Sequence, residues 1–140
     1  MSADLIARLE AATGPDRELD ARIQCSLDGH KFIECEEFGT TLSVRSEGPD
    51  VLGSVRYYTA SIDAALTLVP ELSEKTRPLK LVFGVSESGK RFGCFIDNWA
   101  WGRIGVNECP NWPIALCIAA LKARAAIAKA EGKIEKGEMK

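Results

Sequence analysis

One histidine lies between two cysteines at a spacing that could bind a metal ion. Four residues separate Cys25 from His30, and four more separate His30 from Cys35. Gly29 precedes the histidine, and this pattern matches three of the four ligands of a zinc knuckle. The fourth ligand is missing, because Arg22 stands where the knuckle would need another cysteine. We therefore expect no metal or other cofactor, and we interpret the three residues as neighbours of a helix-to-strand junction.

His30 is the only histidine in the chain, so it is the only imidazole that could act as a general base. It follows Asp28 and Gly29, which are typical of a loop, and no serine or cysteine is placed beside it in sequence as a partner. The acidic residues of the helices are explained by capping or by a solvated helix face. Asp97 is the one acidic candidate that remains, at a predicted strand end. The sequence predicts a protein that is not an enzyme, with an uncharacterised small enzyme as the alternative.

Three tryptophans and an arginine are the best candidates for a recognition surface: Trp99, Trp101, Arg103 and Trp112. Tryptophan and arginine dominate the energetics of interfaces and stack on planar ligands. The alternative is that the indoles form the core beneath a small sheet. Arg56 is a second candidate, because an arginine beside a helix N-terminus could hold an anion; otherwise it lies on a sheet edge.

Two helices are predicted to open the chain. Apolar residues at helical spacing predict a helix over residues 2–12, and a Gly-Pro pair ends it and starts the next. The second helix should run to about Leu27 with its apolar stripe on one side. Its acidic residues are expected on the solvated face: Asp16, Glu18 and Asp20.

Residues 30–58 change to a period of two, which predicts strands. Leu42 and Val44 alternate with polar residues, and residues 51–58 are rich in β-forming types, so a hairpin and a third strand are expected. A second hairpin is predicted over residues 79–96, with a short strand near residues 103–106.

Two later helices complete the predicted elements. Ser61 should cap a helix that Pro70 ends, and Asn111 should cap a last helix that is apolar on nearly all sides from Ile114 to Leu121. This last helix is therefore expected at the centre of the core. Residues 1–130 should form a single domain and residues 131–140 a flexible charged tail.

Composition excludes several classes of protein. With 140 residues the chain suits a single domain, and a net charge of -2 disfavours broad binding to nucleic acid or to an anionic membrane. No apolar run is long enough to cross a membrane, and the first ten residues carry charges that a signal peptide would exclude. The five cysteines are odd in number and lack a C-x-x-C pair, so reduced thiols and a cytoplasmic location are expected.

Three helical segments carry a resemblance to a known family. Residues 5–23 (LIARLEAATGPDRELDARI), 58–70 (YTASIDAALTLVP) and 112–125 (WPIALCIAALKARA) resemble the phage ABA sandwich domain family in sequence and in order. The resemblance implies an α+β fold in which an antiparallel sheet is sandwiched between α-helices, a three-layer α/β/α sandwich. The expected element order is α-α-β-β-β-α-β-β-β-α. The family is named for its fold, so no functional residue comes from it.

A phage or prophage gene implies action inside a bacterial host cell. The leading hypothesis is a small accessory binding protein that acts stoichiometrically on a host or defence protein. A homo-oligomer is expected as part of this hypothesis. Capture of a small nucleotide signal by the tryptophan and arginine cluster is a second hypothesis. A module like a double-stranded-RNA-binding domain is a third, because helix, three strands, helix is its element order. It is disfavoured because residues 111–114 lack the lysines that would grip phosphates.

Overall fold

The computed structural model describes residues 3–49, 52, 54–69, 79–98 and 102–138. The helices in these ranges are α1 (Ala3–Glu10), α2 (Arg17–Leu27), α3 (Ile62–Leu66) and α4 (Trp112–Glu138). The strands are β1 (Lys31–Phe38), β2 (Thr41–Glu47), β3 (Leu79–Val85), β4 (Phe92–Asn98) and β5 (Gly102–Cys109). The fold is α+β, as predicted, and the elements follow the predicted order apart from one expected strand.

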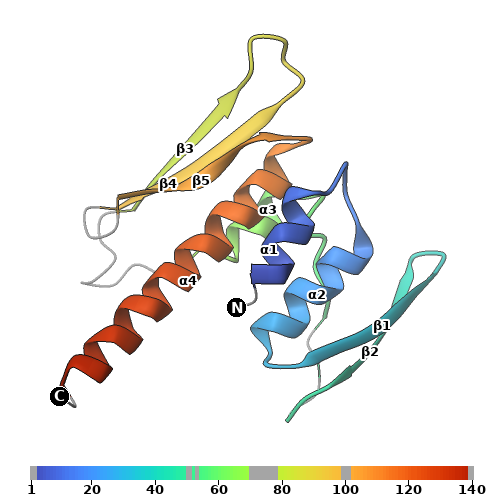
Figure 1. Cartoon of the computed structure of the whole chain (residues 1–140). Helices are drawn as coiled ribbons and strands as arrows, with labels where there is room; N and C mark the ends of the chain where they lie inside the picture. The colour runs from blue at the N-terminus through green and yellow to red at the C-terminus, as the bar shows by residue number, and fades with distance from the viewer. Residues whose placement is uncertain (1–2, 50–51, 53, 70–78, 99–101, 139–140) are drawn as a thin grey trace.

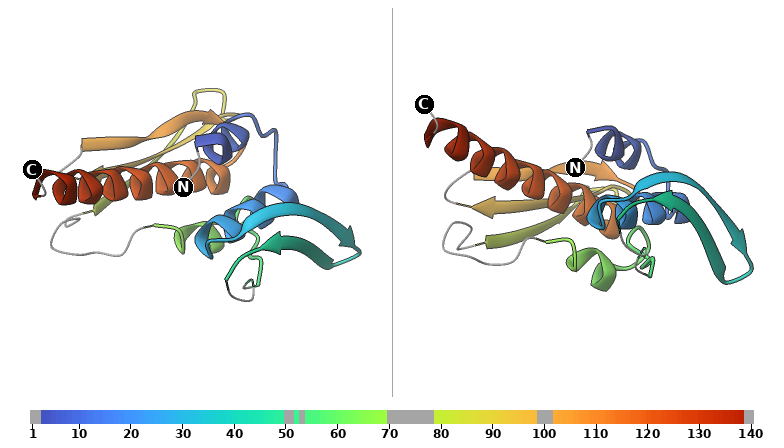
Figure 2. Two further views of the ribbon diagram at one scale, coloured as in Figure 1. Left: turned by 60° about the horizontal axis from the view of Figure 1, so that its bottom comes forward. Right: turned by 90° about the horizontal axis from the view of Figure 1, so that it is seen from below.

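The helices lie between two small antiparallel sheets (Figure 1, Figure 2). On one side α4 packs on β4 and β5 of the sheet β3-β4-β5, and on the other side α2 packs on β1 of the hairpin β1-β2. The expected sandwich placed one sheet between helices. The strands instead form two groups separated in sequence by α3, and each group pairs only within itself, so each sheet covers its own side of the helical layer.

The first part of α4 is the centre of the core. Every residue from Ile114 to Leu121 is 0% exposed, which confirms the interpretation of its continuous apolar sequence. Strands β4 and β5 pack on the helix, and α1 and α3 also contact it. Asn111 begins the helix, since its side-chain oxygen accepts a hydrogen bond from the backbone N–H of Ile114 at 2.8 Å.

Helix α2 departs from the expected pattern of acidic residues. Asp16 is its N-cap and accepts hydrogen bonds from the backbone N–H groups of Glu18 and Leu19. Asp20 was expected on the solvated face, but its residue is only 1% exposed. The expectation was wrong because this side of α2 packs on Thr59, whose backbone N–H and hydroxyl both donate to the Asp20 carboxylate at 2.8 Å.

The hairpin β1-β2 turns at Gly39, whose φ of 63° lies in the region that glycine adopts at little cost. Phe38 and Thr41 are paired on either side of the turn, and the register shifts between Phe32 and Glu34. Such a shift bends a strand and increases its local twist. The hairpin therefore curves around α2, which Figure 1 shows.

The third strand expected over residues 51–58 does not form in its described part. Residue 52 and residues 54–57 have no regular structure, and the sheet beside β2 has two strands. The carbonyls of Val55 and Arg56 accept hydrogen bonds from the Arg17 guanidinium at 3.3 and 3.1 Å. These acceptors are therefore used by a side chain of α2 and not by β2. In the described part of the chain, no helix is both long and apolar enough to cross a bilayer.

Candidate functional site

The predicted tryptophan and arginine cluster does not form one surface among the described residues. Trp99 and Trp101 lie outside the residues that the structure describes. The Arg103 guanidinium donates to both oxygens of Asp97 at 2.8 and 3.0 Å. These hydrogen bonds lower the pKa of Asp97 below its usual value. Arg103 also lies 5.3 Å from the centre of the Phe95 ring, so it belongs to the face of the sheet that points away from α4.

Trp112 lies on the opposite face of the same sheet, at the start of α4. Its indole N–H donates to the carbonyl of Gly84 at 2.9 Å, and its ring meets Phe83 and Phe92 edge to face. Trp112 therefore joins α4 to β3 and β4. This placement agrees better with an indole that packs beneath the sheet than with a recognition surface shared with Arg103. Arg56, the other predicted site residue, is exposed and precedes α3, whose first turn is capped by the Ser61 side chain.

The cysteine and histidine spacing does not produce a metal site in the described part of the chain. Cys25 is inside α2, Cys35 is inside β1, and no group of three potential ligands comes together there. His30 Nδ1 lies 3.0 Å from Ser46 Oγ. Its Nε2 is enclosed and has no hydrogen-bond partner among the described residues. Of the two ring nitrogens, Nδ1 therefore contacts Ser46 and Nε2 is closed off from solvent.

The thiols are kept protonated by burial. Desolvation is the largest cause of the raised pKa of each cysteine, and it raises the pKa of Cys94 to about 11, with a smaller contribution from Cys109. Because the thiolate is the nucleophile, none of these groups is activated for catalysis.

Alkylation of the native protein should therefore follow exposure. At about pH 8 iodoacetamide should modify Cys35, which is half-buried, well before the four buried thiols, because those become accessible only on unfolding. Mass spectrometry of digested samples, with a fully unfolded sample as the control, measures the order. Early modification of Cys25, Cys94, Cys109 or Cys117 would contradict the placement of these residues.

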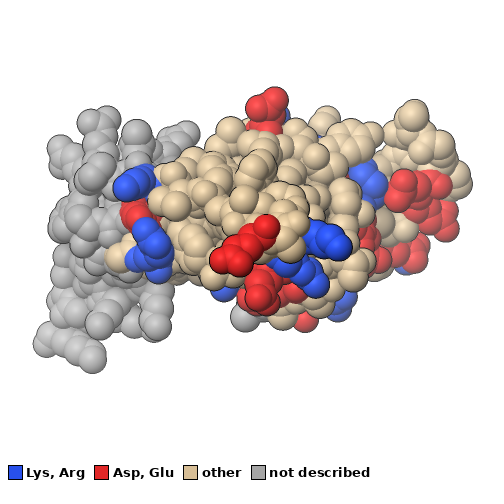
Figure 3. All heavy atoms as spheres, turned by 90° about the horizontal axis from the view of Figure 1, so that it is seen from above, with Lys and Arg blue, Asp and Glu red and all other residues tan. Residues whose placement is uncertain are grey.

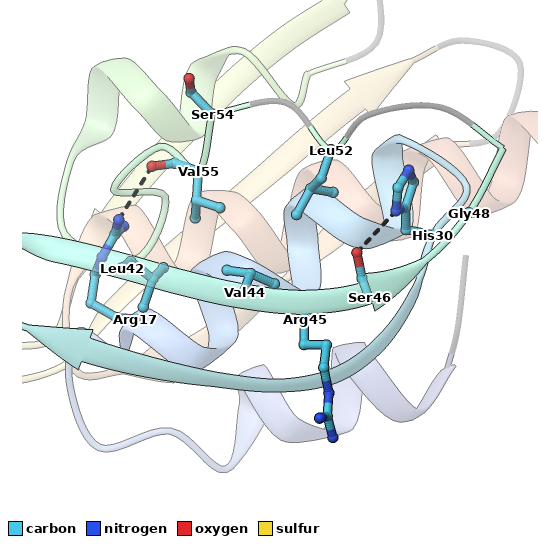
Figure 4. A pocket seen from close by; sticks show the side chains of 10 residues that line it. All are labelled: Arg17, His30, Leu42, Val44, Arg45, Ser46, Gly48, Leu52, Ser54 and Val55. Carbon is cyan, nitrogen blue, oxygen red and sulfur yellow. Dashed lines mark hydrogen bonds between the residues drawn. The ribbon is translucent and has the colours of Figure 1, made fainter.

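A cavity of about 730 Å³ lies beside β2 and forms the candidate site (Figure 4). We call it the β2 groove. Leu42 and Val44 of β2 form one wall, and Leu52 and Val55 of the following segment form the other. The side chain of Arg45 lines the edge of the site but points away from the cavity (Figure 4). The two facing walls therefore present apolar side chains, and Ser46 and Ser54 line the groove beside them.

Polar side chains close the two ends of the β2 groove. At one end, Arg17 donates to the Val55 carbonyl and to Asp20, and its guanidinium stacks 3.9 Å from the centre of the Tyr57 ring. At the other end, His30 meets Ser46 and packs directly on Gly48, where any Cβ would overlap the imidazole. Both end groups are fixed by contacts within the protein, so the shape of the groove is preformed.

The backbone of β2 faces the β2 groove with open hydrogen-bonding positions. The two-residue turn is closed by the pair Phe38 and Thr41, and hydrogen-bonded and non-hydrogen-bonded pairs alternate from there. Leu42 and Val44 thus fall at non-hydrogen-bonded positions, where N–H and C=O point to the outer edge. Among the described residues, no backbone group outside the hairpin pairs with them.

The opposite edge of the hairpin is protected by charge. Strand β1 carries Glu34, Glu36 and Glu37, all exposed, together with the register shift near Ile33. Acidic side chains gather at this end of the molecule (Figure 3). Charges and bulges are common means of preventing pairing at a sheet edge. The edge of β2 at Leu42 and Val44 has neither, so it is the edge of this sheet that is open to another strand.

Comparison of the chain with models of protein families, with curated proteins and with solved structures gives no match.

Sequence reasoning identified the strand that forms one wall of the β2 groove but not the groove. The alternation around Leu42 and Val44 is visible in the sequence. The separation of Val55 from that strand is not visible, because its carbonyl is bound by Arg17, which lies far away in the sequence. An arginine next to a helix N-cap was the only local signal.

Proposed function

We propose that this protein is a non-catalytic binding protein that receives an extended segment of a partner protein in the β2 groove. The segment would pair with β2 and become the third strand of the sheet β1-β2. One observation carries the proposal: residues 52, 54 and 55 run beside β2 without pairing to it, and a cavity of about 730 Å³ occupies the place of a third strand.

The backbone supports a peptide strand as the occupant. In strand addition, main-chain hydrogen bonds supply affinity and pockets for alternate side chains supply specificity. The outward N–H and C=O groups of Leu42 and Val44 offer the main-chain hydrogen bonds. The apolar side chains of Leu52 and Val55 offer the surface that selects side chains. A five-residue antiparallel segment is about 17 Å long, which matches the stretch of β2 from Leu42 to Ser46.

The chemistry of the groove favours a peptide over a nucleotide. A nucleotide needs a cation for its phosphate and a flat surface for its base. Arg17 is already bound to Asp20 and to two carbonyls, and its open face is covered by Tyr57. The nucleotide alternative depends on Trp99 and Trp101, which lie outside the described residues.

The resemblance to the phage ABA sandwich domain family gives this proposal its biological setting. In a phage or prophage protein, the partner would be a host or defence protein, and the effect would be stoichiometric. A small groove with preformed ends suits that role, because capture of one segment needs no turnover. The proposed location is the cytoplasm of the bacterial host.

Selection from a library of random short peptides displayed on filamentous phage tests the proposal. The wild-type protein should enrich uncharged sequences in which apolar residues alternate, because alternate side chains of an added strand face the β2 groove. The Val44→Arg variant should weaken binding of a selected peptide at least about tenfold, since a long cation would fill the groove and repel an apolar strand. Isothermal titration calorimetry measures the difference.

The matched control is Ser43→Arg, on the same strand but with an exposed side chain on the other face. It should bind the selected peptides as the wild type does, and both variants should keep the wild-type melting temperature within a few degrees. The proposal is wrong if no peptide is enriched, or if the enriched peptides bind Val44→Arg as tightly as they bind the wild type.

A further inference from the structure

We infer that two copies of this chain associate through the outer edges of their β3 strands, which form a continuous six-stranded antiparallel sheet. This surface lies on the other sheet from the β2 groove and does not depend on it. Strand β3 is at the edge of the sheet β3-β4-β5, and its outer side has no strand partner among the described residues (Figure 1).

Strand β3 lacks the features that prevent pairing at the other edge of its sheet. Strand β5 carries Arg103 and Glu108, and its register against β4 shifts between Phe92 and Cys94. By contrast, β3 pairs with β4 over all seven residues without a shift, and Lys80 is its one charged residue. A regular, apolar edge strand is a template for pairing with another chain.

Two exposed side chains of β3 lie on the sheet face that α4 packs on, at the margin of the area that the helix covers. Phe83 is 41% exposed and Val85 is 55% exposed. Both share a face with Cys94 and Phe92, their partners on β4. Helix α4 packs mainly on β4 and β5, and it reaches β3 through Trp112, which contacts Phe83 and Gly84. The apolar surface of the sheet therefore continues beyond the helix to the outer edge of β3, where a second copy would cover it.

The hydrogen-bonding direction of β3 fits an antiparallel copy of itself. The Ser86 N–H donates to the Arg91 carbonyl at 2.8 Å, so the next pair, Val85 and Phe92, is at a non-hydrogen-bonded position. By alternation, Leu81 and Phe83 direct their N–H and C=O groups outward. A two-fold axis beside Val82 places Leu81 opposite Phe83 of the second copy, so these outward groups pair with each other.

The same register makes the side chains compatible. Lys80 falls opposite Gly84 of the second copy, which leaves room for the long side chain and keeps the two lysines apart. Val82 falls opposite Val82 of the second copy, and the apolar residues Leu81 and Phe83 face each other on the other side of the sheet. The strand is therefore complementary to itself, which is the requirement for a closed two-fold dimer. This complementarity is the reason for assigning the edge to a second copy.

Cross-linking tests the register directly. In a non-hydrogen-bonded antiparallel pair the Cα atoms are about 4.5 Å apart, which is within the range of a disulfide. The Val82→Cys variant should therefore form a covalent dimer under mild oxidation. Lys80→Cys is the matched control, because two residues at position 80 would be separated by four residues along the strand, or about 13 Å. The wild-type chain, with its five thiols, controls for other disulfides.

Mass measurement by light scattering completes the test. The wild type should have twice the chain mass of 15.2 kDa, and Val82→Lys should be a folded monomer, because two ammonium groups would meet at the axis. Circular dichroism checks the fold of that variant. A monomeric wild type at every concentration from low micromolar upward would overturn the inference. Equal cross-linking of Lys80→Cys and Val82→Cys would overturn it as well.

Discussion

Replacing Asp20 with alanine is expected to lower the free energy of unfolding by about 3–5 kcal/mol. The Asp20 carboxylate is almost fully buried and accepts from the Arg17 guanidinium at 2.8 Å and from two donors of Thr59 at 2.8 Å. Without it, the Arg17 guanidinium and the Thr59 hydroxyl would each lose one of their partners, and the Thr59 backbone N–H would lose its acceptor in the core. Urea denaturation followed by tryptophan fluorescence measures the change.

An exposed ion pair of the same helix is the control for this prediction. Arg22 contacts Glu18 at 3.2 Å, and about half of the Glu18 side chain is exposed. Glu18→Ala should change the free energy of unfolding by less than about 1 kcal/mol, because water screens such a pair. Equal effects of Asp20→Ala and Glu18→Ala would show that the buried network does not hold α2 to the segment around Thr59.

Replacing Leu121 with alanine is expected to cost about 2–5 kcal/mol. Leu121 is 0% exposed and ends the fully buried stretch of α4, so the smaller side chain would leave a cavity between the helix and its neighbours. The size of the loss depends on how far α1, α3 and the sheet can close around that cavity. Thermal and urea denaturation of the purified variant measure it.

Leu66→Ala in α3 is the matched control, since it removes the same atoms from a leucine that is 40% exposed. It should cost about 1 kcal/mol or less, because much of that side chain is already in contact with water. If Leu121→Ala unfolds at the same urea concentration as the wild type, α4 is not the centre of the core.

The elements that depend on local pattern could be predicted from the sequence. Continuous apolar residues from Ile114 to Leu121 predict a fully buried helix, and that helix is present. Large apolar residues at alternate positions, followed by a Ser-Gly turn, predict the pairing of β3 with β4: Leu79, Leu81, Phe83 and Val85. In both cases the periodicity of a single segment determines which side is buried.

The elements that depend on distant contacts could not be predicted. Residues 51–58 have strand-forming composition, yet the Val55 and Arg56 carbonyls are bound by Arg17, which lies nearly forty residues earlier. Asp20 follows the pattern of an exposed helix residue, yet Thr59 buries it. β propensity and helix periodicity describe neighbours in sequence, so a side chain from another element can override both.

In the candidate site too, local pattern was predictable and distant contacts were not. Leu42 and Val44 were recognisable as one face of a strand. The opposing wall of the β2 groove exists because the segment with Leu52 and Val55 does not pair with β2. Arg103 and Trp112 are close in sequence, but Arg103 is in a strand and Trp112 begins a helix, and they lie on opposite faces of the sheet. Proximity in sequence therefore did not predict a shared surface.

Amide hydrogen exchange of β2 tests most directly whether the β2 groove binds an added strand. NMR spectra would be recorded with and without a peptide selected from the displayed library. The amides of Leu42 and Val44 should become protected, because they point to the open edge, whereas the amide of Ser43 should be unchanged, because it pairs with β1. Protection of all three amides to the same degree, or of none, would contradict strand addition at this site.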